Sequence, residues 1–257
     1  MIIYSWNVLY RNRQLRDAFR FIAKSDFDIF CLQEVPEELL ERLKTLPVSI
    51  AYRVDTEKVF PSGIVPMYNV ILSRSPIEAR GEVSFDDYWP QLPLRTRLFV
   101  HLMPTRLFSR IRNRGGLYAD IARRGETVRV FCLHLVLAHP AWRVREFERV
   151  MLARDASVPT IVCGDFNILE KPHITLLNWI LGGRATDALF YTRERTTIEE
   201  RFVEHDLHNA LRGAVTHPLS RSQLDHILAS NTFSIKNASV LPDRVGSDHH
   251  PIRVEIA

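Results

Sequence analysis

The sequence has 257 residues, of which 46% are hydrophobic, so the chain is long enough to bury a large core. No stretch approaches the roughly 20 uninterrupted apolar residues of a membrane span. Residues 1–4 enter a predicted strand without a basic leader, and we therefore expect a soluble, cytoplasmic protein. The net charge of +4 suits a polyanionic partner without requiring one. Cys31, Cys132 and Cys163 each lie in an apolar run, which favours buried thiols over a disulfide framework or a zinc site.

The first half of the chain changes from alternating strands and helices to short strands. Residues 2–6 and 27–32 are apolar runs typical of buried strands, and each precedes a segment with apolar residues at helical spacing. From residue 49 to 103 the pattern predicts consecutive antiparallel strands of a sandwich, at 50–54, 69–73 and 98–103. A hairpin follows, over residues 117–122 and 128–136, and its second strand carries His134.

The second half has a similar rhythm. A helix is predicted over residues 141–156, a buried strand over 159–163 and a short helix from Pro172 to Gly182. Residues 186–219 indicate only weak helical pieces and loops. The chain closes with strands predicted at 224–229, 233–241 and 252–256. Because there is no linker, low-complexity stretch or short repeat, we expect one domain over residues 1–257.

Polar side chains follow several of these strands. Gly164 ends an apolar strand, and Asp165 and Asn167, two positions apart, would point the same way while Phe166 turns to the core. An Asx turn explains this tetrapeptide alone equally well. Other strands repeat the pattern, however, with Asn7, Glu34, His134, Asp225 and His226, and Asp248 and His249. Oxygen ligands with histidines and no cysteine favour Mg²⁺ or Mn²⁺ over Zn²⁺.

These residues lie in short motifs that resemble a known family. The motifs are Ser5-Trp6-Asn7, Leu32-Gln33-Glu34, His134-Leu135, Gly164-Asp165-Phe166-Asn167, Leu224-Asp225-His226-Ile227 and Ser247-Asp248-His249-His250-Pro251. Their order is similar to that of the endonuclease/exonuclease/phosphatase superfamily. This group holds deoxyribonuclease I, exonuclease III, the abasic-site endonucleases, neutral sphingomyelinases and inositol polyphosphate 5-phosphatases. The resemblance implies an α+β fold, a four-layer α/β/β/α sandwich with two mixed β-sheets, and metal-dependent cleavage of a phosphoester.

The resemblance also implies roles for single residues. Glu34 matches the metal-binding glutamate, with Asn7 and Asp248 near the same ion. Members have been described with one metal or two, and that number stays open here.

Among the catalytic positions, His249 matches the catalytic histidine and Asp225 the acid that orients it. Asp165 matches the residue that activates or positions the attacking water, with Asn167 as its partner. His134 matches a position that contacts the scissile phosphate. Either Asp165 or His249 would be the general base.

The substrate is predicted less sharply than the chemistry. Residues 104–116 contain four arginines and no acid. In a nuclease or nucleic-acid phosphodiesterase, the leading prediction, Arg110 and Arg112 would follow a nucleic-acid backbone. In a sphingomyelinase-like or inositol phosphoesterase, the apolar residues of the segment would touch an anionic membrane. A solvated loop explains it as well. Arg145 matches a position where relatives often have arginine, but a solvated helix face accounts for it equally. We expect His226 to pack in the core and His217 to be an ordinary loop residue.

Overall fold

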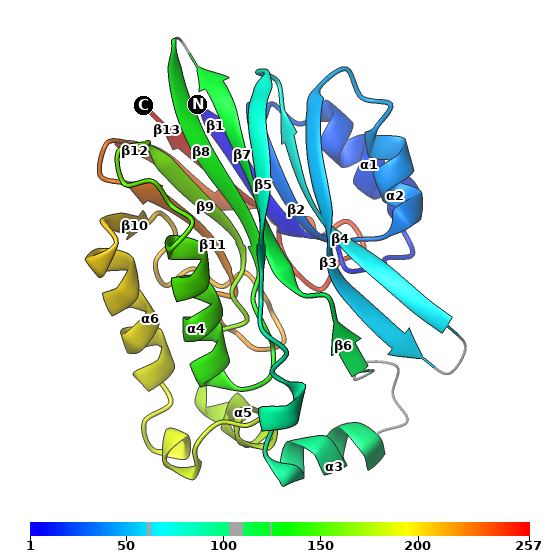
Figure 1. The fold of residues 1–257 in the computed structure, drawn as a ribbon, viewed down its shortest axis with the longest axis vertical. Coiled ribbons are helices and arrows are strands. Elements are labelled where there is room, and N and C mark those ends of the chain that lie inside the picture. Colours follow the sequence, from blue (N-terminus) through cyan, green and yellow to red (C-terminus); the bar gives the residue numbers. More distant parts are fainter. Residues whose placement is uncertain (61–62, 103–109, 124) are drawn as a thin grey trace.

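Two β-sheets lie face to face in the computed structural model, which describes residues 1–60, 63–102, 110–123 and 125–257 (Figure 1). The first sheet has seven strands in the order β12 (Ile235–Val240), β13 (Ile252–Ile256), β1 (Ile2–Asn7), β2 (Ile29–Val35), β4 (Gly63–Ser73), β3 (Ser49–Phe60) and β6 (Arg110–Arg112). The second has six, in the order β10 (Leu207–Asn209), β11 (Asp225–Ser230), β9 (Thr160–Asp165), β8 (Glu126–His134), β7 (Gly115–Arg123) and β5 (Ile77–Ser84). Each sheet is mixed, because β1 and β2 pair in parallel, as do β8 and β9, while their other pairings are antiparallel.

Helices cover the outer faces of both sheets and complete the predicted four-layer sandwich. Leucines of α2 (Glu37–Leu43) and Ile22 of α1 (Leu15–Lys24) pack on the first sheet against Trp6 and Phe30. On the second sheet, α4 (Pro140–Met151) and α6 (Arg193–Glu204) contribute Phe147 and Phe202. Alternation along the strands sends the opposite set of side chains inward to an apolar core between the sheets. The cysteines lie in that core as free, buried thiols, as predicted. No helix of the described residues is long and apolar enough to cross a membrane.

The strand predicted at residues 98–103 is wrong over residues 98–102, because these belong to the helix α3 (Leu94–Leu102), and residue 103 lies outside the described residues. Pro93 precedes it, and α3 docks on α5 (Thr175–Ile180) instead of joining a sheet. The Thr96 hydroxyl donates to the Ile180 carbonyl at 2.7 Å, and Arg95 Nε donates to the Trp179 carbonyl at 2.9 Å. Apolar content alone could not distinguish this helix from a strand. The two helices lie at the end of the sandwich shown at the bottom of Figure 1.

Other boundaries also differ from the predictions. The strands predicted at 50–54 and 69–73 are the inner parts of the longer pair β3 and β4, and β5 was not predicted. Residues 186–219, expected to hold weak helical pieces, contain the three-turn helix α6, which buries Ile198 and Phe202. These two residues are four apart, so they share one helix face on the second sheet. Short 3₁₀ turns lie at Trp89–Gln91, Pro172–Ile174 and Ala185–Ala188.

Candidate active site

The first sheet contributes an amide and a carboxylate at neighbouring strand ends. Asn7 is the last residue of β1, and Glu34 lies in an irregularity of β2 where the register to β4 shifts. Glu34 has a φ of 52°, a left-handed conformation that non-glycine residues rarely adopt. The Asn7 amide donates to Asp165 Oδ2 at 3.0 Å and approaches Glu34 Oε1 at 3.4 Å. The backbone N–H of Tyr10 donates to Glu34 Oε2 at 3.2 Å. Asn7 therefore joins carboxylates from the two sheets.

In the second sheet, Gly164 determines where Asp165 lies. Its φ is 152°, and a Cβ built on it would stand 2.0 Å from the Leu133 carbonyl oxygen, so only glycine permits this approach of β8 to β9. The parallel register then sets His134 beside Asp165. The backbone N–H of Asn167 donates to Asp165 Oδ1 at 2.9 Å, which is the geometry of an Asx turn. The turn and the site are thus the same structure.

Two histidine–carboxylate pairs flank Asp165. Asp225 Oδ2 lies 2.8 Å from His249 Nδ1, and Asp55 Oδ2 lies 2.8 Å from His134 Nδ1. The Nε2 atoms of the two histidines stand 3.7 Å and 3.8 Å from the same oxygen, Asp165 Oδ2. All five side chains are buried. Each ring is therefore fixed at Nδ1 and presents Nε2 to the centre of the site.

The neighbouring carboxylates raise the pKa of both rings. Burial by itself lowers the pKa of His249, but Asp225 and Asp165 outweigh it and raise that pKa to about 10. The pKa of His134 is raised in the same way, by Asp55, Glu34 and Asp165 against the effect of burial. Burial and the charge of Asp225 raise the pKa of Asp165, while the two histidines oppose that rise. At neutral pH His249 is therefore an imidazolium donor, and the pKa of His134 is shifted in the same direction.

Asp55 was missed by the sequence analysis. It lies in β3 beyond residue 54, where we ended the predicted strand, and its side chain is fully buried. Besides His134, the carboxylate accepts from Thr56 Oγ1 at 3.0 Å and from Asn69 Nδ2 at 3.2 Å. A carboxylate inside a strand was the available signal, because an acid there is rarely buried without a partner.

Asp248 and His217 form the rim of the site. The Asp248 side chain is half exposed, with Oδ1 4.0 Å from His249 Nε2 and Oδ2 3.9 Å from His217 Nε2. Partial burial raises the pKa of Asp248, but the nearby His217 and the charge of His249 lower it overall. His217 packs its ring against His249, with centroids 4.8 Å apart, so it lies at the site and not on an open loop as expected. His226 is buried against Phe166, as predicted.

A cavity of about 110 Å³ opens beside these residues. Its apolar wall includes Tyr88 and Trp89, and its polar lining comes from Glu34, Thr56, Lys58, Arg114, His134 and Asn167.

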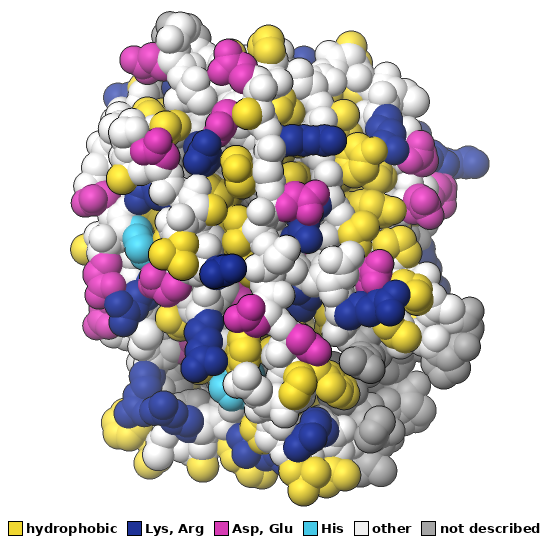
Figure 2. Space-filling view, in the orientation of Figure 1, with side chains coloured by type: hydrophobic (Ala, Val, Ile, Leu, Met, Phe, Trp, Pro, Cys, Tyr) yellow, Lys and Arg dark blue, Asp and Glu magenta, His cyan; other side chains and the backbone are white. Residues whose placement is uncertain are grey.

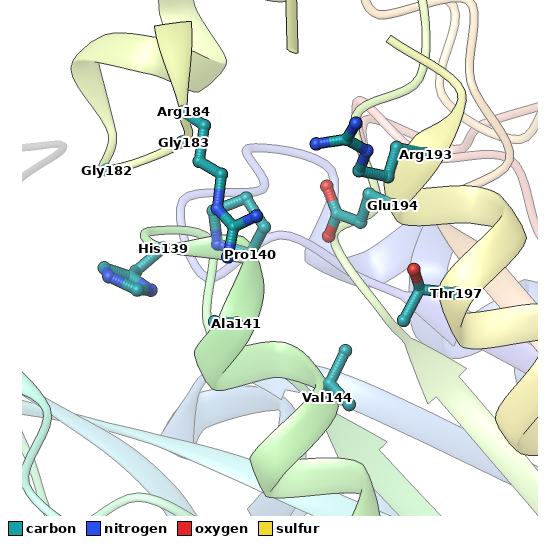
Figure 3. A pocket seen from close by; sticks show the side chains of 10 residues that line it. All are labelled: His139, Pro140, Ala141, Val144, Gly182, Gly183, Arg184, Arg193, Glu194 and Thr197. Atoms are coloured by element: carbon teal, nitrogen blue, oxygen red, sulfur yellow. The ribbon is translucent and has the colours of Figure 1, made fainter. Parts of the chain in front are cut away.

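A larger cavity, of about 290 Å³, lies between the N-terminal ends of α4 and α6 (Figure 3). It is lined by Val144 from α4, by Arg193, Glu194 and Thr197 from α6, and by the turn at Gly182 and Gly183. None of the predicted catalytic or metal-binding residues lines it.

Two of the three predicted substrate-binding arginines, Arg112 and Arg145, make contacts away from the histidine–carboxylate pairs. Arg112 donates to Glu57 at 2.6 Å across the β3–β6 pair, and Arg145 stacks on Trp142 on the exposed side of α4. Arg110 pairs with Val59 in β6, but its side chain and residues 103–109 lie outside the described residues. Arg114 is buried and holds Glu146 with two hydrogen bonds. Basic and acidic side chains are interspersed over the face in Figure 2. The described part of the segment thus offers no continuous basic track.

The donor set fits a hard divalent cation. Side chains from Asp165, Asp225 and His249 bring ligand atoms within 4.8 Å of one another, as do those of His217, Asp248 and His249. Asp225 Oδ1 is buried without a hydrogen-bond partner among the described residues. The two groups include the carboxylates of Asp165, Asp225 and Asp248 and no cysteine, and carboxylate oxygens suit Mg²⁺ or Mn²⁺.

Residues 4–249 match the sequence model of the endonuclease/exonuclease/phosphatase family. The chain belongs to this family. Its members are hydrolases that act on phosphoester bonds, generally with a divalent metal ion. No curated protein sequence matches the chain significantly.

Solved structures of the family share the fold. An endonuclease/exonuclease/phosphatase from Beutenbergia cavernae is 18% identical, with a TM-score of 0.67, covering 100% of this chain and 71% of its own. A mannosyl-6-phosphatase from Bacteroides thetaiotaomicron is 19% identical, with a TM-score of 0.61 and coverage of 100% and 99%. A 3′ phosphatase from Neisseria, solved with a product DNA hairpin, is 18% identical, with a TM-score of 0.60 and the same coverage.

Proposed function

We propose that the chain is a Mg²⁺- or Mn²⁺-dependent phosphoester hydrolase in which a water molecule attacks phosphorus in line. The observation that carries this proposal is the position of Asp165 between two histidines, each fixed by a buried carboxylate. Negative charge builds on the phosphoryl oxygens in the transition state, and rigid cationic donors aimed at that place stabilise it.

Each residue then has a role that follows from its contacts. Glu34, with Asn7 and Asp248, would hold the metal ion, which when bound supplies positive charge to the phosphoryl oxygens. His134 and His249 would donate from Nε2 to phosphate oxygens. Asp165, next to both rings, would orient the attacking water and accept its proton, with its own orientation set by the amides of Asn7 and Asn167. Because the pKa of His249 is raised to about 10, a charged His249 is a donor, and this favours Asp165 as the base.

Nucleic acid is the substrate that we propose first, with a lipid or inositol phosphate as the alternative. The loss of Arg112 and Arg114 to ion pairs weakens the argument from the basic segment. A second candidate activity, removal of a terminal phosphate, is favoured by the small cavity of about 110 Å³ beside Glu34. Two of the structural relatives, the mannosyl-6-phosphatase and the 3′ phosphatase, are named for such reactions.

Hydrolysis of a substrate panel would test the proposal. The panel contains supercoiled and single-stranded DNA, RNA, abasic-site DNA, 3′- and 5′-phosphorylated oligonucleotides, sphingomyelin and inositol phosphates, each with Mg²⁺, Mn²⁺ or EDTA. We expect EDTA, Glu34→Ala and His249→Ala each to remove most activity while the fold persists. Folded variants that turn over a substrate at the parent rate would refute the site. Lys236→Ala, on the partly exposed strand β12, serves as the matched control.

A further inference from the structure

Lys58 is a buried cation in the cavity of about 110 Å³ beside Glu34, and it has no role in the proposed mechanism. It lies in β3, two positions after Thr56, and both side chains line the same cavity as Glu34 and His134. Only 8% of its surface is exposed. A buried ammonium group is costly unless anions or hydrogen bonds compensate it.

The ammonium group of Lys58 is held by an aromatic ring and, among the described residues, forms no salt bridge. Nζ lies 3.7 Å from the centroid of the Tyr10 ring, which is a cation–π contact. Burial lowers the pKa of Lys58, and the charges of Glu34, Asp55 and Asp248 partly offset this. Within the described residues, however, Lys58 has no carboxylate within the 4.0 Å of a salt bridge and no hydrogen bond. Its three N–H donors are therefore available to a ligand in the cavity.

We propose that Lys58 binds a non-bridging oxygen of a terminal phosphate and makes the site prefer a phosphate monoester to an internal diester. This inference rests on the proposed phosphoesterase function. A phosphate monoester has three unesterified oxygens. One would lie next to the metal ion held by Glu34, the two histidines would donate to the second, and Lys58 would donate to the third. A diester would bring an uncharged ester oxygen and its attached chain to the ammonium group. The cavity of about 110 Å³ leaves little room for that second arm beside Tyr88 and Trp89.

Binding of inorganic phosphate, measured calorimetrically in EDTA, tests the contact without turnover or metal. We expect Lys58→Met to weaken phosphate binding roughly 10- to 150-fold, the usual range for losing a hydrogen bond to a charged group. Lys58→Arg should recover part of the affinity. Lys44→Met is the matched control, because Lys44 also lies over a tyrosine ring, that of Tyr52, but pairs with Glu41 at the exposed C-terminal end of α2. Unchanged phosphate affinity in folded Lys58→Met would overturn the contact. If Lys58→Met does not fold, Lys58→Gln takes its place.

The preference for a monoester is tested by comparing kcat/KM for 4-nitrophenyl phosphate and its methyl diester, which share a leaving group. We expect Lys58→Met to lower the ratio of monoester to diester activity at least tenfold. An equal loss on both esters would refute the specificity role. If the parent hydrolyses neither ester nor any member of the panel, the proposed function fails, while the phosphate-binding experiment still decides whether Lys58 binds an anion.

Discussion

Replacing Asp55 by asparagine would test the contribution of the Asp55–His134 pair independently of the rest of the site. Asp55 and His134 are both buried and their hydrogen bond is 2.8 Å long, so the carboxylate orients the ring and stabilises its positive charge. The asparagine amide is a poor substitute. If the asparagine oxygen faces His134, the asparagine NH₂ group faces Asn69 Nδ2, which is also a donor. If the side-chain amide is rotated by half a turn, His134 Nδ1 has to accept a hydrogen bond, and the ring adopts the other tautomer.

The size of the effect follows from that contact. A hydrogen bond to a charged group contributes about 1.5–3 kcal/mol net, and each 1.4 kcal/mol is about a factor of ten. We therefore expect Asp55→Asn to reduce kcat/KM roughly 10- to 150-fold on whichever substrate the panel identifies.

The assay combines steady-state kinetics with an NMR titration of His134. In the parent the pKa of His134 is raised by Asp55, Glu34 and Asp165, and the variant should titrate at lower pH because the first of these charges is gone. Glu57→Gln is the matched control, since Glu57 lies on the same strand but pairs with Arg112 near the surface. If His134 titrates as in the parent and kcat/KM falls less than twofold, the orienting role of Asp55 is wrong.

Two further predictions concern stability. Arg114→Met should cost about 3–5 kcal/mol of unfolding free energy, because among the described residues Glu146 then keeps its buried charge with only the Val136 amide as partner. Urea unfolding of the Arg114→Met and Arg114→Met/Glu146→Gln variants measures this cost, and a double variant no more stable than the single one contradicts the reasoning. Burial and the charge of Arg195 hold the pKa of His226 well below its usual value. Below about pH 6.5 the unfolded chain binds a proton at this histidine that the folded state does not bind. The free energy of unfolding therefore decreases as the pH is lowered, by up to about 1.4 kcal/mol per pH unit. The His226→Phe variant should lack this pH-dependent contribution. If the free energies of unfolding of the parent and the variant change in parallel from pH 7.5 to 5.5, the role of His226 is ruled out.

Much of the site was predictable because its residues end strands. The position of Asp165 followed from Gly164 and the apolar run before it, and His226 was placed in the core from alternation alone. Asp55 and Lys58 were not found, because β3 continues past the point where its apolar residues stop. That extension depends on pairing with β4 and β6, which a single strand's sequence does not contain. For the same reason the docking of α3 on α5 could not be predicted.

The geometry of the candidate active site depends on how the two sheets pack. Asp55 comes from the first sheet and His134 from the second, so their hydrogen bond spans the sandwich. Beneath it, Asn69 Nδ2 bonds both Asp55 and the Cys132 carbonyl, and Gln33 Nε2 approaches Cys132 Sγ at 3.3 Å. A purely apolar layer would tolerate small shifts of one sheet over the other, whereas directional hydrogen bonds in a buried layer restrict them. In the proposed mechanism, these polar contacts between the sheets would fix the distances between the two histidine pairs and Asp165, on which the chemistry depends.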